Sequence, residues 1–249
     1  MMNNIIISGC SYSTNSDAVP YPIHLKNTTN LNVTNLAWPG QGNDTIVRTI
    51  KEQLRSGVTN TIFICQLSYL HRKSFFCNEL NQWIDFQPSI INSNPDIKDG
   101  NIKFDFDLSN ISNSVIGVYG ARRRSNVNLS EQTYKKLIQW YHDYLFYLYN
   151  EETEFTQLMY MIDELSTQIK NSNNKILYLY WPDVFFNLDI IKKNNFLQIE
   201  NEYSMLKWSK VNNLTNTYDT HLSTEGHLEL TKHIINNLNL TQVRDFSLL

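Results

Sequence analysis

Three short apolar runs, each bounded by polar or turn-forming residues, constrain the fold of this chain more than any other feature. They are Asn4–Ser8, Thr61–Leu67 and Lys175–Trp181. All three are rich in β-branched and aromatic residues and are too short for buried helices, which is typical of strands covered on both faces. A weaker alternation of apolar and polar residues predicts a further strand over Leu31–Ala37.

Helical patterns lie between these strands. After the break at residues 38–42, Asn43 or Asp44 is a candidate cap for a helix that carries apolar residues at helical spacing. Three further helices are predicted at about Ser130–Tyr149, Glu152–Lys170 and Ser223–Leu238, the last capped by Ser223. Strands that alternate with helices predict a parallel sheet with helices on both faces, which is a three-layer α/β/α fold.

The length of 249 residues suits one domain, so we predict a single domain over residues 1–249. It carries an insertion at about residues 72–128, which is too long for a plain loop. An alternating segment at residues 102–108 predicts that this insertion forms a small cap with a hairpin or an edge strand. We interpret the run Arg122-Arg123-Arg124 as solvated surface rather than an anion site.

Composition excludes several function classes. With 21 Lys+Arg against 24 Asp+Glu, the net charge is −3, and we expect no nucleic-acid partner. Three cysteines without a CxxC pair favour neither a disulfide framework nor a cysteine-rich zinc site. The first residues lack the basic region of a signal peptide, and no run approaches ~20 apolar residues, so we expect no membrane span and a cytoplasmic protein. No sequence feature indicates an oligomeric state.

Two segments far apart in the sequence hold candidate catalytic residues. Ser11 follows the first strand, and ligands of parallel α/β sheets bind beyond the carboxyl ends of the strands. A serine hydroxyl needs an adjacent base, and His221, with Asp219 two residues before it, precedes the last helix. An acid so placed can orient the imidazole. Taken singly, these residues also fit a turn and an exposed loop. The other histidines lie in helices or lack a carboxylate nearby in the sequence: His24, His71, His142, His227 and His233.

A third segment, Asn35 to Asn43, contains two glycines at a strand-to-helix turn, Gly40 and Gly42. Glycines let backbone N–H groups approach a ligand closely, as half of an oxyanion hole would require. The segment matches neither a dinucleotide fingerprint nor a phosphate-binding loop.

Together these segments resemble the SGNH (GDSL-type) hydrolase family. Gly9-Cys10-Ser11 stands where that family has Gly-Asp-Ser, and Asn35 to Gly40 matches its second block. Asp219 and His221 match its last block. The resemblance implies a flavodoxin-like SGNH hydrolase fold, with Ser11 as nucleophile, His221 as base and Asp219 as the orienting acid. It requires no metal and no organic cofactor.

This chain departs from the family pattern at three points. Cys10 replaces the usual Asp, Asp219 lies two rather than three residues before His221, and the third block, Gly-x-Asn-Asp, is missing. The resemblance places the oxyanion at the N–H groups of Ser11 and Gly40. The side-chain donor that the third block would supply must come from Asn43, Gln66 or Ser68.

The resulting prediction is a serine esterase for small acyl esters, with O-acetylated carbohydrate as the preferred substrate class. Two alternatives stay open: a non-catalytic binding or structural protein on the same fold, and an acyltransferase. Cys10 is a minor alternative nucleophile. We interpret the aromatic residues of the helix after the insertion as core packing rather than a stacking platform for bases or sugars: Trp140, Tyr141, Tyr144, Phe146, Tyr147 and Tyr149.

Overall fold

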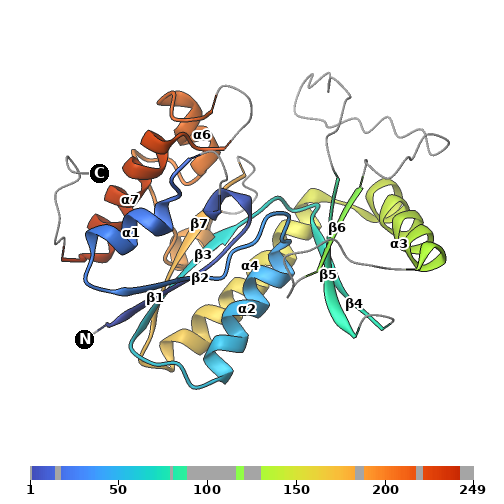
Figure 1. Ribbon diagram of the computed structural model, residues 1–249, viewed down its shortest axis with the longest axis horizontal. Coiled ribbons are helices and arrows are strands. Elements are labelled where there is room, and N and C mark those ends of the chain that lie inside the picture. The colour runs from blue at the N-terminus through green and yellow to red at the C-terminus, as the bar shows by residue number, and fades with distance from the viewer. Residues whose placement is uncertain are drawn as a thin grey trace.

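A computed structural model of the chain describes residues 2–14, 18–78, 81–88, 116–120, 130–182, 188–216 and 221–241. Its main sheet has four parallel strands in the order β2-β1-β3-β7 (Figure 1). Their bounds are β1 Asn4–Ser8, β2 Asn32–Asn35, β3 Thr61–Leu67 and β7 Lys175–Tyr180. In the register of β1 with β3, Ser8 lies opposite Cys65. The carboxyl ends of these two central strands therefore meet at one edge of the sheet.

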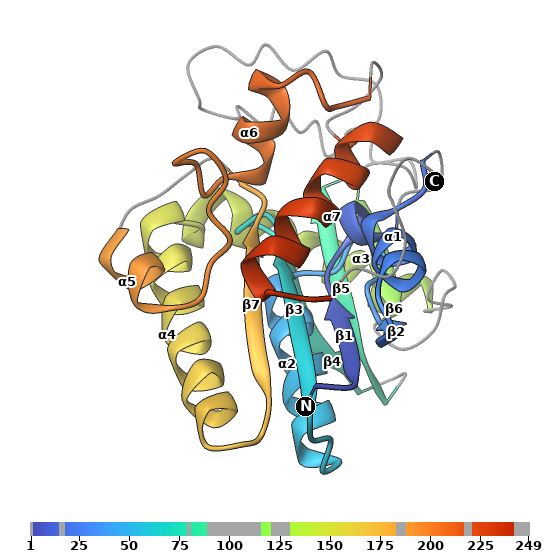
Figure 2. The same ribbon diagram turned by 90° about the vertical axis from the view of Figure 1, so that its left-hand side faces the viewer.

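Helices cover both faces of this sheet (Figures 1 and 2). α1 (Tyr21–Thr28) and α7 (Thr224–Leu238) lie on one face, and α2 (Asn43–Arg55) and α4 (Glu151–Lys170) lie on the other. The short helices α5 (Leu188–Lys193) and α6 (Met205–Val211) follow β7. The predicted three-layer α/β/α fold with a parallel sheet is confirmed.

The alternation of side chains along the strands builds a separate core on each face. Ile5 and Ile7 point toward α1 and α7, whereas Ile6 points toward α2 and α4. In β3, Ile64 belongs to the first core and Phe63 to the second. Every residue of β3 is buried, which accounts for its uninterrupted apolar run.

Most predicted elements lie where the sequence places them. β1 and β3 have the expected bounds, and the Ser223 hydroxyl caps α7 by accepting the Gly226 N–H at 3.1 Å. β2 is shorter than expected, because it is a half-exposed edge strand with little apolar surface to bury. Trp181 lies just beyond β7.

The predicted cap of α2 is wrong. The helix begins at Asn43 itself, with Gly42 as its N-cap residue and no side-chain cap. The side-chain amide of Asn43 instead bonds to the segment after β3. α1 was not expected from the sequence, because its apolar periodicity is weak and its N-cap residue is Pro20, which offers no side-chain cap.

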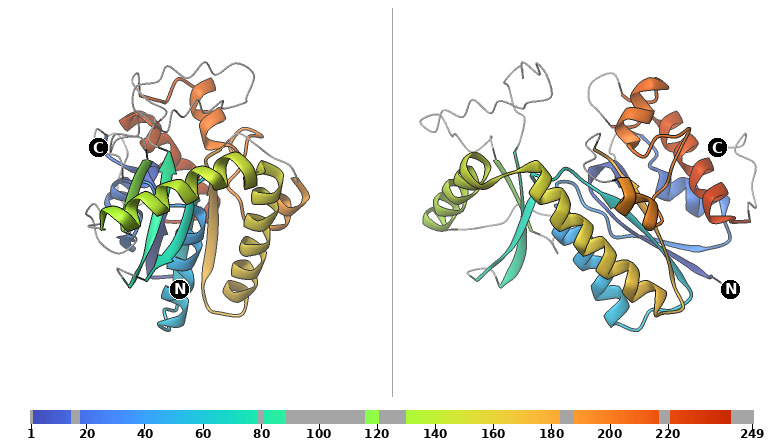
Figure 3. Two further views of the ribbon diagram at one scale, coloured as in Figure 1. Left: turned by 90° about the vertical axis from the view of Figure 1, so that its right-hand side faces the viewer. Right: turned by 180° about the vertical axis from the view of Figure 1, so that it is seen from behind.

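Part of the segment at residues 72–128 forms a second, antiparallel sheet in the order β4-β5-β6. Its strands are β4 Lys73–Cys77, β5 Gln82–Pro88 and β6 Ile116–Gly120. Together with α3 (Glu131–Asp143), it makes up the end of the molecule opposite α1 and α7 (Figures 1 and 3). The alternating segment at residues 102–108 and the arginine run at 122–124 lie outside the described residues.

Among the aromatic side chains that the structure describes in α3 and in the π-helical turn η3 (Tyr144–Leu148), two are buried and two are exposed. Tyr141 and Tyr144 are buried, as the core interpretation requires. Trp140 and Tyr147 are 43% and 79% exposed, so for these two side chains that interpretation is wrong.

In the parts of the chain that the structure describes, no helix combines the length and the apolar character that crossing a bilayer requires. The three cysteines are free and buried.

Candidate active site

The strand order β2-β1-β3-β7 places a topological switch point between β1 and β3. β1 leads toward α1 on one face, whereas α2 and α4 pack on the other, so the connections on the two sides diverge at this edge. Such a switch point is where open α/β sheets bind ligands. A single turn of 3-10 helix, η1 (Ser11–Ser13), follows β1 there and carries Ser11.

The structure brings Ser11 and His221 together across 210 residues of sequence. The Oγ atom of Ser11 lies 2.9 Å from Nε2 of His221. In the tautomer that carries its proton on Nδ1, Nε2 accepts the serine hydroxyl, which is the arrangement of a nucleophile and its general base. The expected proximity of these two side chains is therefore present.

The backbone around His221 is held by a short antiparallel pairing just before α7. Thr215 pairs with Leu222, and the Asn216 N–H donates to the carbonyl of His221 at 2.8 Å. The Ser223 N–H donates to the carbonyl of Leu214 at 2.8 Å. This pairing fixes the position of the backbone at His221 and therefore the starting point of its side chain.

A stack of aromatic rings supports the imidazole from the side. The ring of Tyr12 lies 4.5 Å from that of His221 and stacks on Trp181 at 3.7 Å between centroids. The hydroxyl groups of Tyr12 and Tyr69 lie 3.1 Å apart. These three aromatic residues were not among the site residues expected from the sequence. Each lies within a few residues of a strand end, which is the signal that could have found them.

Gln66, near the end of β3, holds the turn that carries Ser11. Its Oε1 atom accepts the backbone N–H of Cys10 at 3.0 Å and the Ser13 hydroxyl at 3.2 Å, and the Cys10 thiol lies 3.4 Å away. Its Nε2 atom donates to the carbonyl of Leu67 at 2.6 Å. The side chain is 2% exposed. Gln66 is thus bonded into the protein and supports the residues on both sides of Ser11.

Gly9 is the residue that lets Gln66 approach so closely. A Cβ atom at position 9 would lie 2.8 Å from Oε1 of Gln66 and 2.8 Å from Oγ of Ser13. These distances are shorter than van der Waals contact, so a side chain here would push the glutamine and the turn apart. Close packing against Gln66 and Ser13 therefore requires a glycine at the first position of the Gly9-Cys10-Ser11 motif.

Asn43 and Ser68 bond to each other rather than facing Ser11. The Asn43 amide donates to the carbonyl of Ser68 at 3.1 Å and accepts the Ser68 N–H at 2.7 Å. A second, longer contact runs from the same amide to the carbonyl of Tyr69 at 3.5 Å. The Ser68 hydroxyl accepts a hydrogen bond from Arg72 at 2.8 Å. In this arrangement the amide hydrogens that an oxyanion would need already have acceptors.

The turn that contains Gly40 lies beside the Ser11 turn. The Trp38 N–H donates to the carbonyl of Gly9 at 3.1 Å. Asn35 donates through Nδ2 to the carbonyl of Ser13 at 2.9 Å. Gly40 has a φ of 84°, a left-handed conformation that glycine adopts without strain. The segment from Asn35 to Gly40 therefore lies next to the Ser11 turn.

Asp219 lies outside the described residues, so its orienting role stays a prediction. Among the other histidines, His24 and His227 are buried, and burial lowers the pKa of each, to about 3 for His227. His233 packs edge-on against Trp208. The side chain of Cys10 is fully buried, which disfavours its thiol as a nucleophile.

Within the described ranges, no three His, Cys, Asp or Glu side chains are grouped as metal ligands would be.

Comparison with known proteins does not identify a family for this chain. No protein-family model and no curated protein matches the chain. One solved structure similar to it is the crystal structure of protein YXIM from Bacillus subtilis, with 11% identity and a TM-score of 0.44 over 96% of this chain. The chain spans 56% of the length of that protein. At this level of similarity the comparison carries no information about the site.

Proposed function

We propose that this protein is a serine hydrolase that cleaves small acyl esters. The observation that carries the proposal is the 2.9 Å contact between the Ser11 hydroxyl and Nε2 of His221, at the edge of the sheet where ligands bind. A serine and a histidine so placed can perform acyl transfer, and the reaction needs neither a metal nor an organic cofactor.

In the first half-reaction, Oγ of Ser11 attacks the ester carbonyl carbon while Nε2 of His221 removes the hydroxyl proton. The tetrahedral intermediate collapses with release of the alcohol, which receives that proton from His221. In the second half-reaction, His221 deprotonates a water molecule that attacks the acyl-serine. The bond to Oγ of Ser11 then breaks, Oγ receives the proton from His221, and the free acid leaves. Asp219 is proposed to orient His221 throughout.

The developing oxyanion requires donors that are already in place. We propose the backbone N–H groups of Ser11 and Gly40 for this task, since the turns that carry them lie side by side. Asn43 and Gln66, two of the side-chain donors expected from the sequence, are proposed to act as positioning residues because their amide groups donate within the protein. We propose the same role for Ser68, whose hydroxyl accepts a hydrogen bond from Arg72.

The decisive experiment combines covalent labelling with kinetics. A fluorophosphonate probe should label the wild-type protein, with the adduct mapped to the peptide that contains Ser11. Ser11→Ala and His221→Ala should each abolish nearly all hydrolysis of 4-nitrophenyl acetate, and the double variant should be little worse than either, because such residues act as a unit.

The same experiment separates the alternatives. A non-catalytic protein would show neither labelling nor turnover. An acyltransferase would label at Ser11 but release product only with an alcohol acceptor. Asp219→Asn should reduce turnover by ~10⁴ if the carboxylate holds the imidazole as in the serine-protease triad. A loss below about tenfold would point to a Ser–His dyad.

A further inference from the structure

A second candidate site lies between the first turns of α2 and the part of the protein formed by β4, β5 and α3. It is a cavity of about 460 Å³, which falls within the range of small-molecule sites, ~300–1,000 Å³. Neither Ser11 nor His221 lines it. The lining residues are Asp44, Arg48, Lys73, Ser74, Trp83, Trp140 and Tyr144.

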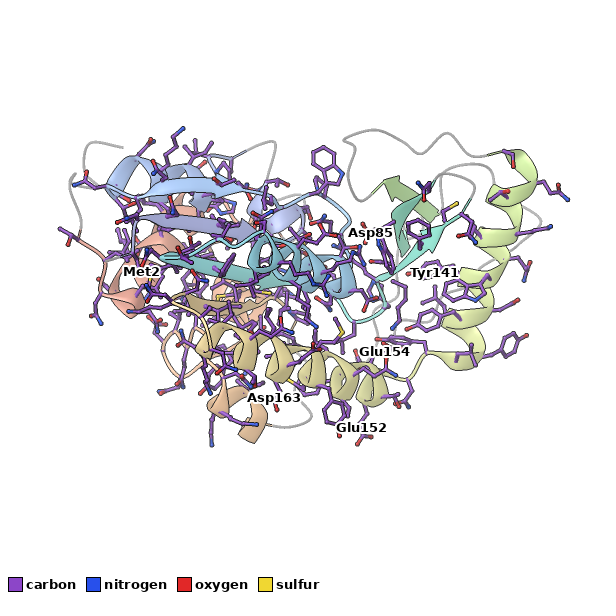
Figure 4. The ribbon with its side chains drawn as sticks, turned by 90° about the horizontal axis from the view of Figure 1, so that it is seen from below. Met2, Asp85, Tyr141, Glu152, Glu154 and Asp163 are labelled. Carbon is purple, nitrogen blue, oxygen red and sulfur yellow. The ribbon has the colours of Figure 1, made fainter. Side chains whose placement is uncertain are left out.

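Buried carboxylates fix the walls of this cavity. Asp85 is fully buried, and its Oδ1 atom accepts hydrogen bonds from the Gly42 N–H at 3.2 Å, the Thr45 hydroxyl at 2.7 Å and the Ser74 hydroxyl. Because these groups belong to the start of α2 and to β4, Asp85 ties the two walls together. Burial raises its pKa above the usual range. Figure 4 shows Asp85 and Glu154 at the junction between the two parts of the protein.

Glu154 fixes the opposite side of the cavity. It accepts the hydroxyl of Tyr144 at 2.7 Å and forms an ion pair with Lys73, which joins β4 to α4 and η3. The site is therefore formed by side chains on regular elements, which the hydrogen bonds of Asp85 and the contacts of Glu154 hold in place. A ligand would meet a cavity that needs little reorganisation.

Two indole rings, those of Trp83 and Trp140, line the cavity. Trp140 stacks on Tyr144 at 5.8 Å with nearly parallel planes, yet 43% of its side chain is exposed. The guanidinium carbon of Arg48 lies over the ring of Trp83, 3.7 Å from the ring centroid. The face of an aromatic ring is electron-rich and attracts the weakly positive C–H bonds of a saturated ring.

The cavity and its surroundings carry no excess of positive charge. The two cations, Arg48 and Lys73, face three carboxyl groups, those of Asp44, Asp85 and Glu154, and Lys73 is already paired with Glu154. A phosphate or another multiply charged anion would find no excess of positive charge here. Hydroxyl groups can both donate to carboxylates and accept from cations, so a neutral ligand rich in hydroxyls suits the mixture.

From the aromatic faces, the lack of excess positive charge and the size, we propose that this cavity binds a neutral sugar ring, with Trp140 as its stacking platform. The proposal goes beyond the esterase activity and holds whether or not Ser11 is a nucleophile.

Titration calorimetry with the full chain tests the proposal. The probes are maltotriose, cellotriose and N,N′-diacetylchitobiose as neutral saccharides, with digalacturonate and ADP as charged competitors. At least one neutral saccharide should bind, and Trp140→Ala should weaken that binding about tenfold or more, since stacking and burial of the ring are both lost. Trp140→Phe should retain part of the affinity.

Tyr160→Ala is the matched control, because Tyr160 is an aromatic side chain on α4 that is 71% exposed and does not line the cavity. It should bind the saccharide as the wild type does. Hydrolysis of 4-nitrophenyl acetate, followed in parallel, reports on Ser11 alone and should not change in Trp140→Ala. If no neutral saccharide binds at ~10 mM, where a site of even ~1 mM Kd would be nearly filled, the proposal is overturned. Equal affinity in wild type and Trp140→Ala, or tighter binding of digalacturonate or ADP, would overturn it as well.

Discussion

Replacing Gln66 with leucine tests whether this residue positions the Ser11 turn. Leucine has a similar size but offers no acceptor to the Cys10 N–H, which Oε1 of Gln66 accepts at 3.0 Å in the wild type. The Ser13 hydroxyl would also lose Oε1, although the Tyr21 hydroxyl at 2.9 Å remains beside it.

The expected loss of stability follows from these two contacts. Leaving a buried N–H unpaired costs about 1–3 kcal/mol, and losing one neutral hydrogen bond costs about 1 kcal/mol. The free energy of unfolding should therefore fall by about 2–4 kcal/mol. For a chain of this length, each kcal/mol corresponds to about 2–4 °C in Tm, so a decrease of roughly 5–15 °C is expected.

The substitution should also slow the reaction in the molecules that remain folded. Cys10 and Ser13 flank Ser11, and a shift of about 1 Å in a reacting group can reduce turnover about 10²-fold. We expect kcat for 4-nitrophenyl acetate, or the rate of fluorophosphonate labelling, to fall about 10- to 100-fold under conditions where the variant is fully folded.

Leu165→Ala is the matched control. Leu165 is a fully buried residue of α4, remote from the Ser11 turn, and its truncation should cost about 2–5 kcal/mol without moving Ser11. If Gln66→Leu is destabilised yet reacts within about twofold of Leu165→Ala, Gln66 contributes to stability only and the positioning argument fails.

Three further predictions follow from the same contacts. Gly9→Ala should lower the free energy of unfolding by about 1–3 kcal/mol, since its Cβ would crowd Gln66 and Ser13, and an unchanged urea midpoint would contradict this. Asn43→Ala should cost about 1–3 kcal/mol because the buried Ser68 N–H loses its acceptor, but kcat should fall less than about fivefold. A loss of ~10²–10³ would instead identify Asn43 as an oxyanion donor. His227 is neutral when folded, with a pKa of about 3, and titrates near ~6.5 when unfolded, so stability should decline as the pH falls from ~6.5 toward 3. The decline reaches about 1.4 kcal/mol per pH unit, and His227→Gln should show a shallower decline in urea midpoints between pH 7 and pH 4.5.

The sequence by itself determines the layers of the fold. The apolar runs of β1, β3 and β7 identify strands buried on both faces, because only such strands lack polar alternation over their length. Ser223 marks the start of α7 through a contact with Gly226, three residues later, and contacts this local are readable from spacing. Ser11 and His221 could be singled out because each follows or precedes a regular element that the sequence identifies.

The tertiary structure decided what the polar side chains near Ser11 do. Gln66 meets Cys10 and Ser13 only because the register of β1 with β3 places it beside the turn, on the same face as Ile64. Asn43 reaches Ser68 across 25 residues for a similar reason. No local pattern encodes such pairings, since an amide in a sequence looks the same whether it faces a substrate or a neighbouring backbone.

The same reason accounts for the aromatic residues of α3. Periodicity identifies a helix with an aromatic stripe, but which part of the stripe is covered depends on where β4, β5 and α4 pack against it. Tyr141 and Tyr144 are buried by that packing, whereas Trp140 remains partly exposed beside a cavity. Exposure is set by contacts between distant segments, and these exist only once the chain has folded.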